Sequence, residues 1–190
     1  MRILCFGDSN TYGYDPSSFL GDRYPSQYRW TDIIERKQQN WKVINLGENG
    51  REIPRREEEW ARFNQMLVKH KPIDLLMIML GTNDLLQGNS EEEVARRMKS
   101  FLGNIDLEKS KILLIGPPRL QLGQWVATKN LIAASLKLNK AYEALSKRIG
   151  VGFADAGSWD IPMTFDGVHF TEDGHNAFAE RLINHFNKGE

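Results

Sequence analysis

Short apolar runs alternate along this chain with longer stretches in which apolar and polar residues mix. Five of the runs end at a glycine, a proline or a short polar residue, and we expect each to form a buried strand. The third run is apolar at almost every position, which is typical of a central parallel strand covered on both faces. The predicted strands are residues 3–6, 41–46, 74–80, 111–115 and 151–154.

The mixed stretches between the strands carry apolar residues at three- and four-residue spacing, which predicts helices that bury one face. Gly150 is expected to end the longest of them. Because strands and helices alternate, the pattern predicts a three-layer α/β/α sandwich around a parallel sheet. The residues expected at the helix starts are Thr31, Pro54, Ser90 (which opens a capping-box pattern), Thr128 and Thr171.

Composition narrows the class of protein. The chain has 190 residues, 41% of them hydrophobic, which predicts one globular domain over residues 1–190. Its 25 Lys and Arg residues balance 25 Asp and Glu residues, so no net charge attracts it to nucleic acid or to an anionic membrane. A small-molecule substrate fits this balance better.

The single cysteine and the apolar runs bear on the compartment. Cys5 is the only cysteine, so a disulfide within the chain is excluded, and its place in the first apolar run indicates a buried thiol. The longest apolar run, residues 75–80, is far below the ~20 residues that cross a bilayer. The four apolar residues before Gly7 are too few for a secretory signal. We therefore expect a soluble, cytoplasmic protein.

Short polar residues follow the predicted strands at the points where each strand ends. In a parallel sheet the carboxyl ends of the strands share one edge, where α/β proteins bind their ligands. Taken singly, each of these residues is more often only a turn residue. Together they predict one site, formed by Asp8-Ser9-Asn10 after the first strand, Asn49-Gly50 after the second, Asn83-Asp84 after the third, and Asp166 with His169 beyond the fifth.

The residue types in this set suit acyl transfer. A serine such as Ser9 is a poor nucleophile at neutral pH unless a base lies within hydrogen-bond reach and a third group orients that base. Asp166 and His169 lie three residues apart in a loop with a glycine between them, so the carboxylate is able to hold one imidazole nitrogen while the other faces Ser9. Donors for a developing oxyanion are available from the N–H groups of Ser9 and Gly50 and from the Asn83 side-chain amide.

At these positions the chain resembles the SGNH hydrolases, also called GDSL-type esterases and lipases. Four motif blocks carry the resemblance, they occur in the order of the family, and they span nearly the whole chain. The blocks are Gly7-Asp8-Ser9, Asn45 with Gly50, Gly81-Thr82-Asn83-Asp84, and Asp166-Gly167-Val168-His169.

The resemblance implies Ser9 as nucleophile, His169 as general base and acid, and Asp166 as the orienting carboxylate. It also implies an oxyanion hole formed by Ser9, Gly50 and Asn83, with Gly50 preferred to Gly47 because its distance from Asn45 fits the family pattern better. The implied fold is flavodoxin-like with strand order 2-1-3-4-5. No cofactor and no metal are implied.

The chain looks most like the small arylesterase and acyltransferase branch of the family, whose members oligomerise, so a homo-oligomer is implied. The implied activity is hydrolysis of short-chain acyl esters of small alcohols, aryl alcohols or sugars. Asn10 departs from the family pattern, in which leucine follows the serine, and is expected to influence the choice of substrate. The residues expected in the substrate pocket, from their place in strand-end loops, are Asn10, Tyr12, Tyr14, Asp84, Arg119, Gln121 and Trp125.

Other functions fit part of the pattern. Acyl transfer to alcohols or a lysophospholipase-like activity would use the same residues. A metal-dependent phosphoesterase would draw on Asp8, Asn83, Asp84 and His169 as ligands, but only four histidines are present. A non-catalytic binder of a small ligand has no need of nucleophile, base and oxyanion donors together. His175 is a rival base, but its place one turn into the last predicted helix favours a structural role.

Overall fold

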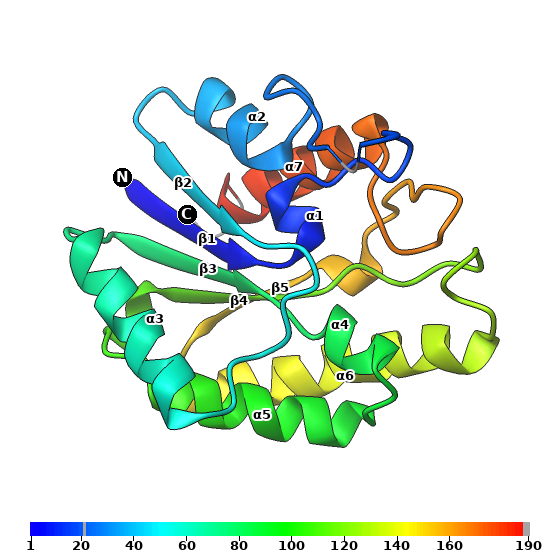
Figure 1. The fold of residues 1–190 in the computed structure, drawn as a ribbon. Helices are drawn as coiled ribbons and strands as arrows, with labels where there is room; N and C mark the ends of the chain where they lie inside the picture. The colour runs from blue at the N-terminus through cyan, green and yellow to red at the C-terminus, as the bar shows by residue number, and fades with distance from the viewer. Residues whose placement is uncertain (21, 188–190) are drawn as a thin grey trace.

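A five-stranded parallel sheet forms the middle layer of the protein (Figure 1). The computed structural model describes residues 1–20 and 22–187. The strand order is β2-β1-β3-β4-β5, so the predicted fold class and order 2-1-3-4-5 are confirmed. The strands are β1 (Arg2–Gly7), β2 (Lys42–Gly47), β3 (Leu75–Met79), β4 (Ile112–Gly116) and β5 (Gly152–Asp155), each within one or two residues of its predicted bounds.

Helices cover both faces of the sheet, which completes the sandwich (Figure 1). On one face lie α2 (Trp30–Lys37) and α7 (Glu172–Asn187), which contact each other. On the other lie α3 (Glu57–Lys69), α5 (Glu91–Gly103) and α6 (Lys129–Ile149). Two short helices, α1 (Ser9–Tyr12) and α4 (Thr82–Leu86), begin where β1 and β3 end. These single turns of helix lie at the edge where the site was predicted, and the sequence pattern indicated only turns there.

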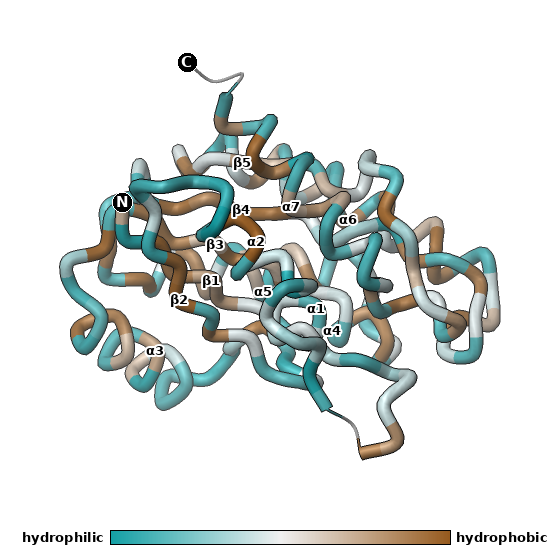
Figure 2. Tube along the Cα trace, turned by 90° about the horizontal axis from the view of Figure 1, so that it is seen from above, coloured by the Kyte–Doolittle hydropathy of each residue, from teal (hydrophilic) through white to brown (hydrophobic). Residues whose placement is uncertain are grey.

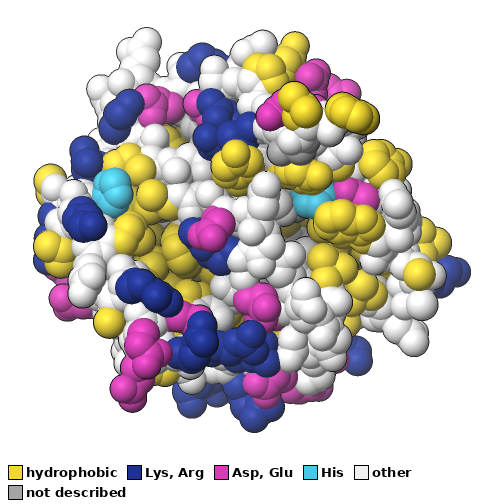
Figure 3. All heavy atoms as spheres, viewed as in Figure 1, with side chains coloured by type: hydrophobic (Ala, Val, Ile, Leu, Met, Phe, Trp, Pro, Cys, Tyr) yellow, Lys and Arg dark blue, Asp and Glu magenta, His cyan; other side chains and the backbone are white. Residues whose placement is uncertain are grey.

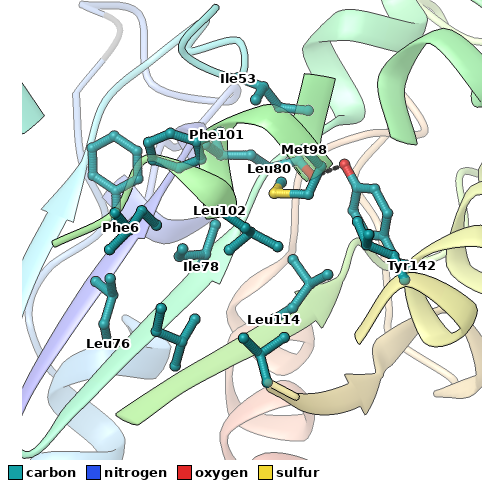
Figure 4. Packing of buried hydrophobic residues seen from close by; sticks show 14 of the residues in the cluster. Phe6, Ile53, Leu76, Ile78, Leu80, Met98, Phe101, Leu102, Leu114 and Tyr142 are labelled. Atoms are coloured by element: carbon teal, nitrogen blue, oxygen red, sulfur yellow. Dashed lines mark hydrogen bonds between the residues drawn. The ribbon is translucent and has the colours of Figure 1, made fainter. Parts of the chain in front are cut away.

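The sheet separates two hydrophobic cores. Alternate residues of β1 point to opposite faces, so Phe6 joins the core under α3, α5 and α6, while Cys5 joins the core under α2 and α7. Figure 2 shows the strands as mainly hydrophobic segments, and Figure 4 shows Phe6 and Phe101 side by side in the larger core. Cys5 is buried, as its place in the first apolar run indicated. Burial of each large side chain contributes about 1.5–3 kcal/mol, so the cores fix the positions of the strand ends.

Two of the predicted helix starts are wrong. Helix α2 begins at Trp30, before Thr31, because the buried indole of Trp30 donates to the Asn10 carbonyl at 3.0 Å and fixes the first turn through tertiary packing. Helix α3 begins at Glu57 rather than near Pro54. The Pro54 carbonyl instead accepts from the indole N–H of Trp60 at 2.9 Å, which holds the loop before the helix.

The other helix termini follow the sequence signals. Ser90 caps α5 and accepts from the Glu93 N–H at 3.3 Å, although the Glu93 carboxylate pairs with arginines rather than closing a capping box. Thr128 occupies the N-cap of α6 without a side-chain hydrogen bond, and Gly150 ends that helix in the left-handed conformation. Among the described residues, the helices are all too short or too polar to cross a membrane.

Candidate active site

Ser9 lies at the first position of α1, immediately after β1. The Asp8 side chain caps this helix by accepting from the Asn10 N–H at 3.0 Å, and the backbone closes the turn through Gly13 N–H and the Ser9 carbonyl at 2.8 Å. At the first helical position the Ser9 N–H has no partner within the helix. The turn therefore presents both the Ser9 hydroxyl and a backbone N–H at the sheet edge.

Ser9, His169 and Asp166 form a continuous chain of hydrogen bonds. The His169 Nε2 atom lies 2.9 Å from the Ser9 Oγ, and its Nδ1 lies 2.6 Å from the Asp166 Oδ2. All three side chains are buried, with at most 6% of each residue exposed. This is the geometry in which an imidazole takes the serine proton while a carboxylate fixes its orientation.

Asp166 is held as a carboxylate. Its Oδ1 accepts from the N–H groups of Val168 and His169 and from the Thr164 hydroxyl, at 2.8 to 2.9 Å. Burial by itself raises the pKa of Asp166, but the hydrogen bonds from the His169 ring and from the two backbone N–H groups outweigh it and hold the pKa well below its usual range. The group that orients His169 is therefore ionised at neutral pH.

A second loop, residues 120–126, holds the Asp166–His169 segment through backbone hydrogen bonds between the two loops. The Gln121 N–H donates to the Gly167 carbonyl at 3.0 Å, and the Trp125 N–H donates to the Asp166 carbonyl at 3.1 Å. A Cβ atom on Gly123 would lie 2.4 Å from the Asp166 carbonyl carbon, so only glycine fits there. Gly123 was not predicted from the sequence, because nothing in its local pattern shows that another backbone passes so close.

Asn10 joins the turn that carries Ser9 to the loop that carries Asp166 and His169. Its side-chain amide donates to the Val168 carbonyl at 2.9 Å, and its oxygen accepts from the Phe170 N–H at 2.9 Å. The residue is only 5% exposed. The expectation that Asn10 lines the substrate pocket is therefore corrected: both ends of its amide are engaged with backbone groups of the protein.

Gly50 and Gly47 play different parts. Gly50 has a φ of +73°, is exposed in the loop after β2, and would accept a Cβ atom with nothing within 4 Å of it. A Cβ on Gly47 would lie 2.1 Å from the Tyr12 backbone nitrogen, so Gly47 lets α1 pack against β2. The open, positive-φ position of Gly50 suits a backbone N–H that must approach a ligand.

Asn83 lies in the first turn of α4 and is half-buried. One hydrogen of its amide donates to the Arg51 carbonyl at 3.0 Å. An asparagine amide carries two such hydrogens, so the second stays available for a ligand. The bond to Arg51 also ties α4 to the loop that contains Gly50.

Two aromatic side chains flank His169. The ring of Tyr14 lies edge-on at 4.8 Å between centroids, and the ring of Trp125 lies edge-on at 5.1 Å. Trp125 is 51% exposed. The ring of Tyr12, another residue expected in the pocket, instead stacks against the Arg23 guanidinium at 4.4 Å. Figure 3 shows hydrophobic side chains around a histidine at the right of the face drawn.

Asp84 is not a pocket residue, which corrects its predicted role. Its side chain is fully buried, accepts from the Ile53 N–H at 3.1 Å and forms an ion pair with Arg97 at 3.0 Å. Burial raises the pKa of Asp84, although the bonds from Ile53 and Arg97 oppose the rise. Of the other two candidates, Arg119 is exposed, and the Gln121 amide donates to the Ile161 carbonyl at 3.1 Å.

Asp8 and His175 are two further buried titratable groups near Ser9 and His169. Burial raises the pKa of Asp8 from 3.8 to about 6, although the Asn10 N–H and the charges of His169 and Arg51 act in the opposite direction. His175, the rival base, is buried in α7, where its Nδ1 accepts from the Trp30 N–H at 3.4 Å. Burial lowers the pKa of His175 to about 3, so it is neutral at physiological pH.

The groups proposed above as metal ligands have other partners. Asp8 caps α1, Asp84 pairs with Arg97, and His169 bonds to Ser9 and Asp166. Over residues 1–20 and 22–187, no three His, Cys, Asp or Glu side chains gather as a metal ion would require. A cavity of about 540 Å³ opens between the β2–α3 loop and α3, and its lining includes Arg51 and Phe63 but not Ser9. Asp166 and His169 do not line this cavity either.

Comparisons with known proteins agree with the fold. A family model described as the GDSL-like Lipase/Acylhydrolase family matches residues 5–177. A search of curated protein sequences gave no significant match. Among solved structures, the inhibitor-bound aryl esterase of M. smegmatis is 25% identical, with a TM-score of 0.84 and 98% of each chain covered.

Two other solved structures are similar over their full length. A protein of Agrobacterium tumefaciens str. C58, provisionally named an arylesterase, is 29% identical, with a TM-score of 0.83 and 98% of each chain covered. Est24, a carbohydrate acetylesterase from Sinorhizobium meliloti, is 24% identical with a TM-score of 0.83. That match covers 100% of this chain and 99% of Est24, and it shows the fold alone.

Proposed function

The chain belongs to the GDSL-like lipase/acylhydrolase family, and on that premise we propose that it is a serine esterase that cleaves short-chain acyl esters through an acyl-Ser9 intermediate. The observation that carries the proposal is the hydrogen-bonded chain from Asp166 through His169 to Ser9, with spacings of 2.6 and 2.9 Å. No other arrangement of these three groups serves nucleophilic catalysis as directly.

In the first half of the reaction, Ser9 Oγ attacks the ester carbonyl carbon while His169 Nε2 takes the hydroxyl proton. The negative oxygen of the tetrahedral intermediate accepts hydrogen bonds from the N–H groups of Ser9 and Gly50 and from the Asn83 amide. The intermediate collapses when the carbon–oxygen bond to the alcohol breaks. The alcohol leaves with the proton from His169, and the acyl group stays on Ser9.

In the second half, His169 takes a proton from water, and the resulting hydroxyl attacks the acyl-enzyme. A second tetrahedral intermediate forms at the same donors and releases the carboxylic acid, with the proton returned to Ser9. Asp166 remains ionised throughout and stabilises the imidazolium, because its pKa lies well below the usual range.

The surroundings of His169 support a small acyl group. Tyr14 and Trp125 approach the imidazole from two directions, at 4.8 and 5.1 Å between ring centroids, and narrow the space beside it. The half-exposed ring of Trp125 offers an apolar contact for the alcohol part of the ester. Aryl and sugar alcohols both present a face that packs against an indole, so the two classes must be compared by experiment.

Covalent labelling tests the nucleophile. We expect a fluorophosphonate to add once to the protein, with the modified peptide carrying Ser9, and Ser9→Ala to abolish both the adduct and the cleavage of 4-nitrophenyl acetate. Ser17→Ala, which changes an exposed serine of the following loop, serves as the matched control and should behave as wild type. An adduct elsewhere, or ester cleavage that survives in Ser9→Ala, would contradict the proposal.

The substrate class is tested with a panel of acetyl, butanoyl and octanoyl esters of 4-nitrophenol, together with acetylated sugars. We expect kcat/KM to fall as the acyl chain grows. A preference for octanoyl esters would contradict the assignment of a small acyl group. The homo-oligomer implied by the family resemblance stays a prediction, which light scattering on the purified protein measures.

A further inference from the structure

We propose that Arg51 is a positioning residue that holds the three oxyanion donors in one geometry, an inference that rests on the esterase function proposed above. Arg51 directly follows Gly50 in the loop after β2. It lies outside the four sequence motifs, and its hydrogen bonds go to groups other than Ser9 and His169. Those bonds nevertheless reach Gly7, two residues before Ser9, and the side-chain amide of Asn83, and they close the turn that contains Gly50.

The guanidinium group bridges the ends of two strands. Its Nη1 donates to the Gly7 carbonyl at 2.7 Å and to the Leu46 carbonyl, which lie at the ends of β1 and β2 next to the site. Gly7 comes two residues before Ser9, so this contact fixes the strand end from which the nucleophile turn begins. The ring of Phe6 lies under the guanidinium at 4.1 Å from its centroid, and Glu48 binds its Nη2 at 2.6 Å.

The backbone of Arg51 completes the arrangement. Its carbonyl accepts one hydrogen of the Asn83 amide at 3.0 Å, which leaves the second amide hydrogen in a defined direction. Its N–H donates to the Glu48 carbonyl at 3.3 Å, which closes the turn that contains Gly50. One residue therefore sets the relative positions of the Ser9, Gly50 and Asn83 donors.

Arginine suits this task because its donors form a rigid fork that reaches two carbonyl groups together, whereas lysine presents a single flexible ammonium. Only 18% of the Arg51 side chain is exposed, so its hydrogen bonds form with little competition from water. The loop has a second attachment, the bond from the Ile53 N–H to Asp84. Loss of the Arg51 side chain should therefore displace the loop without unfolding the protein.

Kinetics of Arg51→Ala and Arg51→Lys test the proposal against Arg55→Ala, a neighbouring arginine that is half-exposed and pairs with Glu52. Removal of one oxyanion donor commonly lowers kcat about 10²- to 10³-fold, and a displaced set should cost about 10- to 100-fold. We expect that loss in kcat for Arg51→Ala, KM within about threefold of wild type, and a smaller loss for Arg51→Lys. Arg55→Ala should match wild type.

Two further measurements separate positioning from a merely structural role. Affinity for a phenylboronic acid, whose adduct with Ser9 carries a negative tetrahedral oxygen, should fall in parallel with kcat across the variants. Added guanidinium ion, at concentrations too low to denature, should restore part of the kcat of Arg51→Ala and leave Arg55→Ala unchanged. A kcat of Arg51→Ala within threefold of wild type, with an unchanged melting temperature, would overturn the proposal.

Nuclear magnetic resonance gives a readout that does not depend on turnover. The backbone amide of Gly50 and the side-chain amide of Asn83 should shift in the folded Arg51 variants and stay in place in Arg55→Ala. Unshifted Gly50 and Asn83 signals overturn the positioning role even if no ester is cleaved. An inactive wild type, or activity that survives in Ser9→Ala, would contradict the esterase proposal. In that case the Gly50 and Asn83 signals still test the positioning role of Arg51.

Discussion

The two halves of the site are held in place by different forces. On one side, the turn that carries Ser9 and the loop that carries Asp166 and His169 are joined mainly through backbone groups and close packing. On the other, the Gly50 loop and the α4 turn with Asn83 are joined through buried charged side chains. The proposed mechanism needs both halves at a fixed separation, so the comparison predicts which kind of substitution should disrupt each half.

The half with the triad depends on steric fit. The Trp125 N–H binds the Asp166 carbonyl, and Gly123 packs flat against the same peptide. Asn10 adds two hydrogen bonds across 158 and 160 residues of sequence. In this half the groups in contact are mostly uncharged, and added volume is the change they tolerate least.

The half with the proposed oxyanion donors depends on charge. Asp84 is fully buried between the Ile53 N–H and Arg97, and Arg51 bridges two strand ends above Phe6. A Cβ atom at Gly50 would meet nothing within 4 Å, although the φ of +73° there still favours glycine. Figure 3 shows charged side chains of both signs gathered on the lower part of the face, where α3 and α5 lie. This half should respond most to the loss of a charge.

Gly123→Ala should give the largest effect. The added methyl group would lie 2.4 Å from the Asp166 backbone, so the catalytic loop must move. A displacement of about 1 Å at a catalytic group costs about 100-fold in rate, and we expect kcat to fall by at least that factor. Steady-state kinetics with an aryl acetate measure the loss.

Gly103→Ala is the matched control, because a Cβ at Gly103 meets no atom within 4 Å. Its kcat should equal that of wild type. If Gly123→Ala kept more than a tenth of wild-type kcat, the triad half would not depend on steric fit in the way the contacts indicate.

Asn10→Leu, which installs the residue usual in the family, should come next. It removes both hydrogen bonds to the catalytic loop and leaves the buried Val168 carbonyl and Phe170 N–H without partners. We expect a loss of about 3 kcal/mol in the free energy of unfolding, measured by denaturant titration, and a fall of about tenfold in kcat.

The acyl-chain preference of Asn10→Leu should stay that of wild type, because the side chain faces the protein. A changed acyl-chain preference without loss of stability would instead indicate that Asn10 contacts the substrate. Asn104→Leu, on the exposed end of α5, controls for the substitution itself and should change stability by no more than about 0.5 kcal/mol.

Asp84→Asn should have a smaller effect, and it probes the charged half. The substitution keeps the shape of the side chain but removes the charge that faces Arg97, for an expected loss of about 2 kcal/mol in the free energy of unfolding. The Ile53 segment should loosen, and kcat should fall about fivefold with KM little changed.

Glu93→Gln removes the charge of another partner of the same arginine, one that is a third exposed. Exposed pairs contribute about 0–1 kcal/mol, so this variant should be close to wild type. Equal losses for Asp84→Asn and Glu93→Gln would contradict the special role of the buried pair.

The pH dependence of stability gives the smallest effect. The pKa of Asp8 is raised to about 6 by burial, so the folded protein disfavours its charged form. Stability from this group is fully present below the ordinary carboxyl pKa of 3.8 and is lost as the pH rises through about 6. Asp166 acts with the opposite sign, since its lowered pKa contributes stability above the ordinary value that is lost as the pH falls.

Asp8→Asn isolates the first of these two contributions. Its melting temperature should match that of wild type below pH 3.8 and exceed it by a few degrees above about pH 6, because the amide carries no charge to bury. Thermal melts of the two proteins across this range measure the difference. A difference that does not change with pH would contradict the raised pKa of Asp8.

Local patterns were sufficient for the elements and for the motif residues. The five apolar runs predicted the strands within one or two residues, and the signals at Ser90 and Gly150 marked true helix ends. The starts of α2 and α3 were missed, because the packing of two tryptophan side chains outweighs the local preference of Thr31 and Pro54. Boundaries set by long-range contacts leave no mark at the residues where they occur.

For the candidate site, the sequence predicted which residues meet at the sheet edge but not which of them line the substrate pocket. The residues around Ser9, Gly50, Asn83 and His169 follow strands, so their meeting at one edge follows from a parallel sheet. The pocket roles of Asn10 and Asp84 could not be separated from structural roles, because a buried amide and an exposed one look alike in sequence. Arg51 and Gly123 carry no motif at all.

The sequence by itself determined which residues stand at the strand ends, and that they include a serine, a histidine, an aspartate, a glycine and an asparagine of the types that acyl transfer requires. Apolar periodicity and turn residues act over a few positions, so the chain records them directly. Only the tertiary structure decided which polar groups face each other. It also decided which of them form hydrogen bonds within the protein and are therefore not available to a ligand. Those pairings join residues as far apart as Asn10 and Phe170, and they depend on packing in three dimensions.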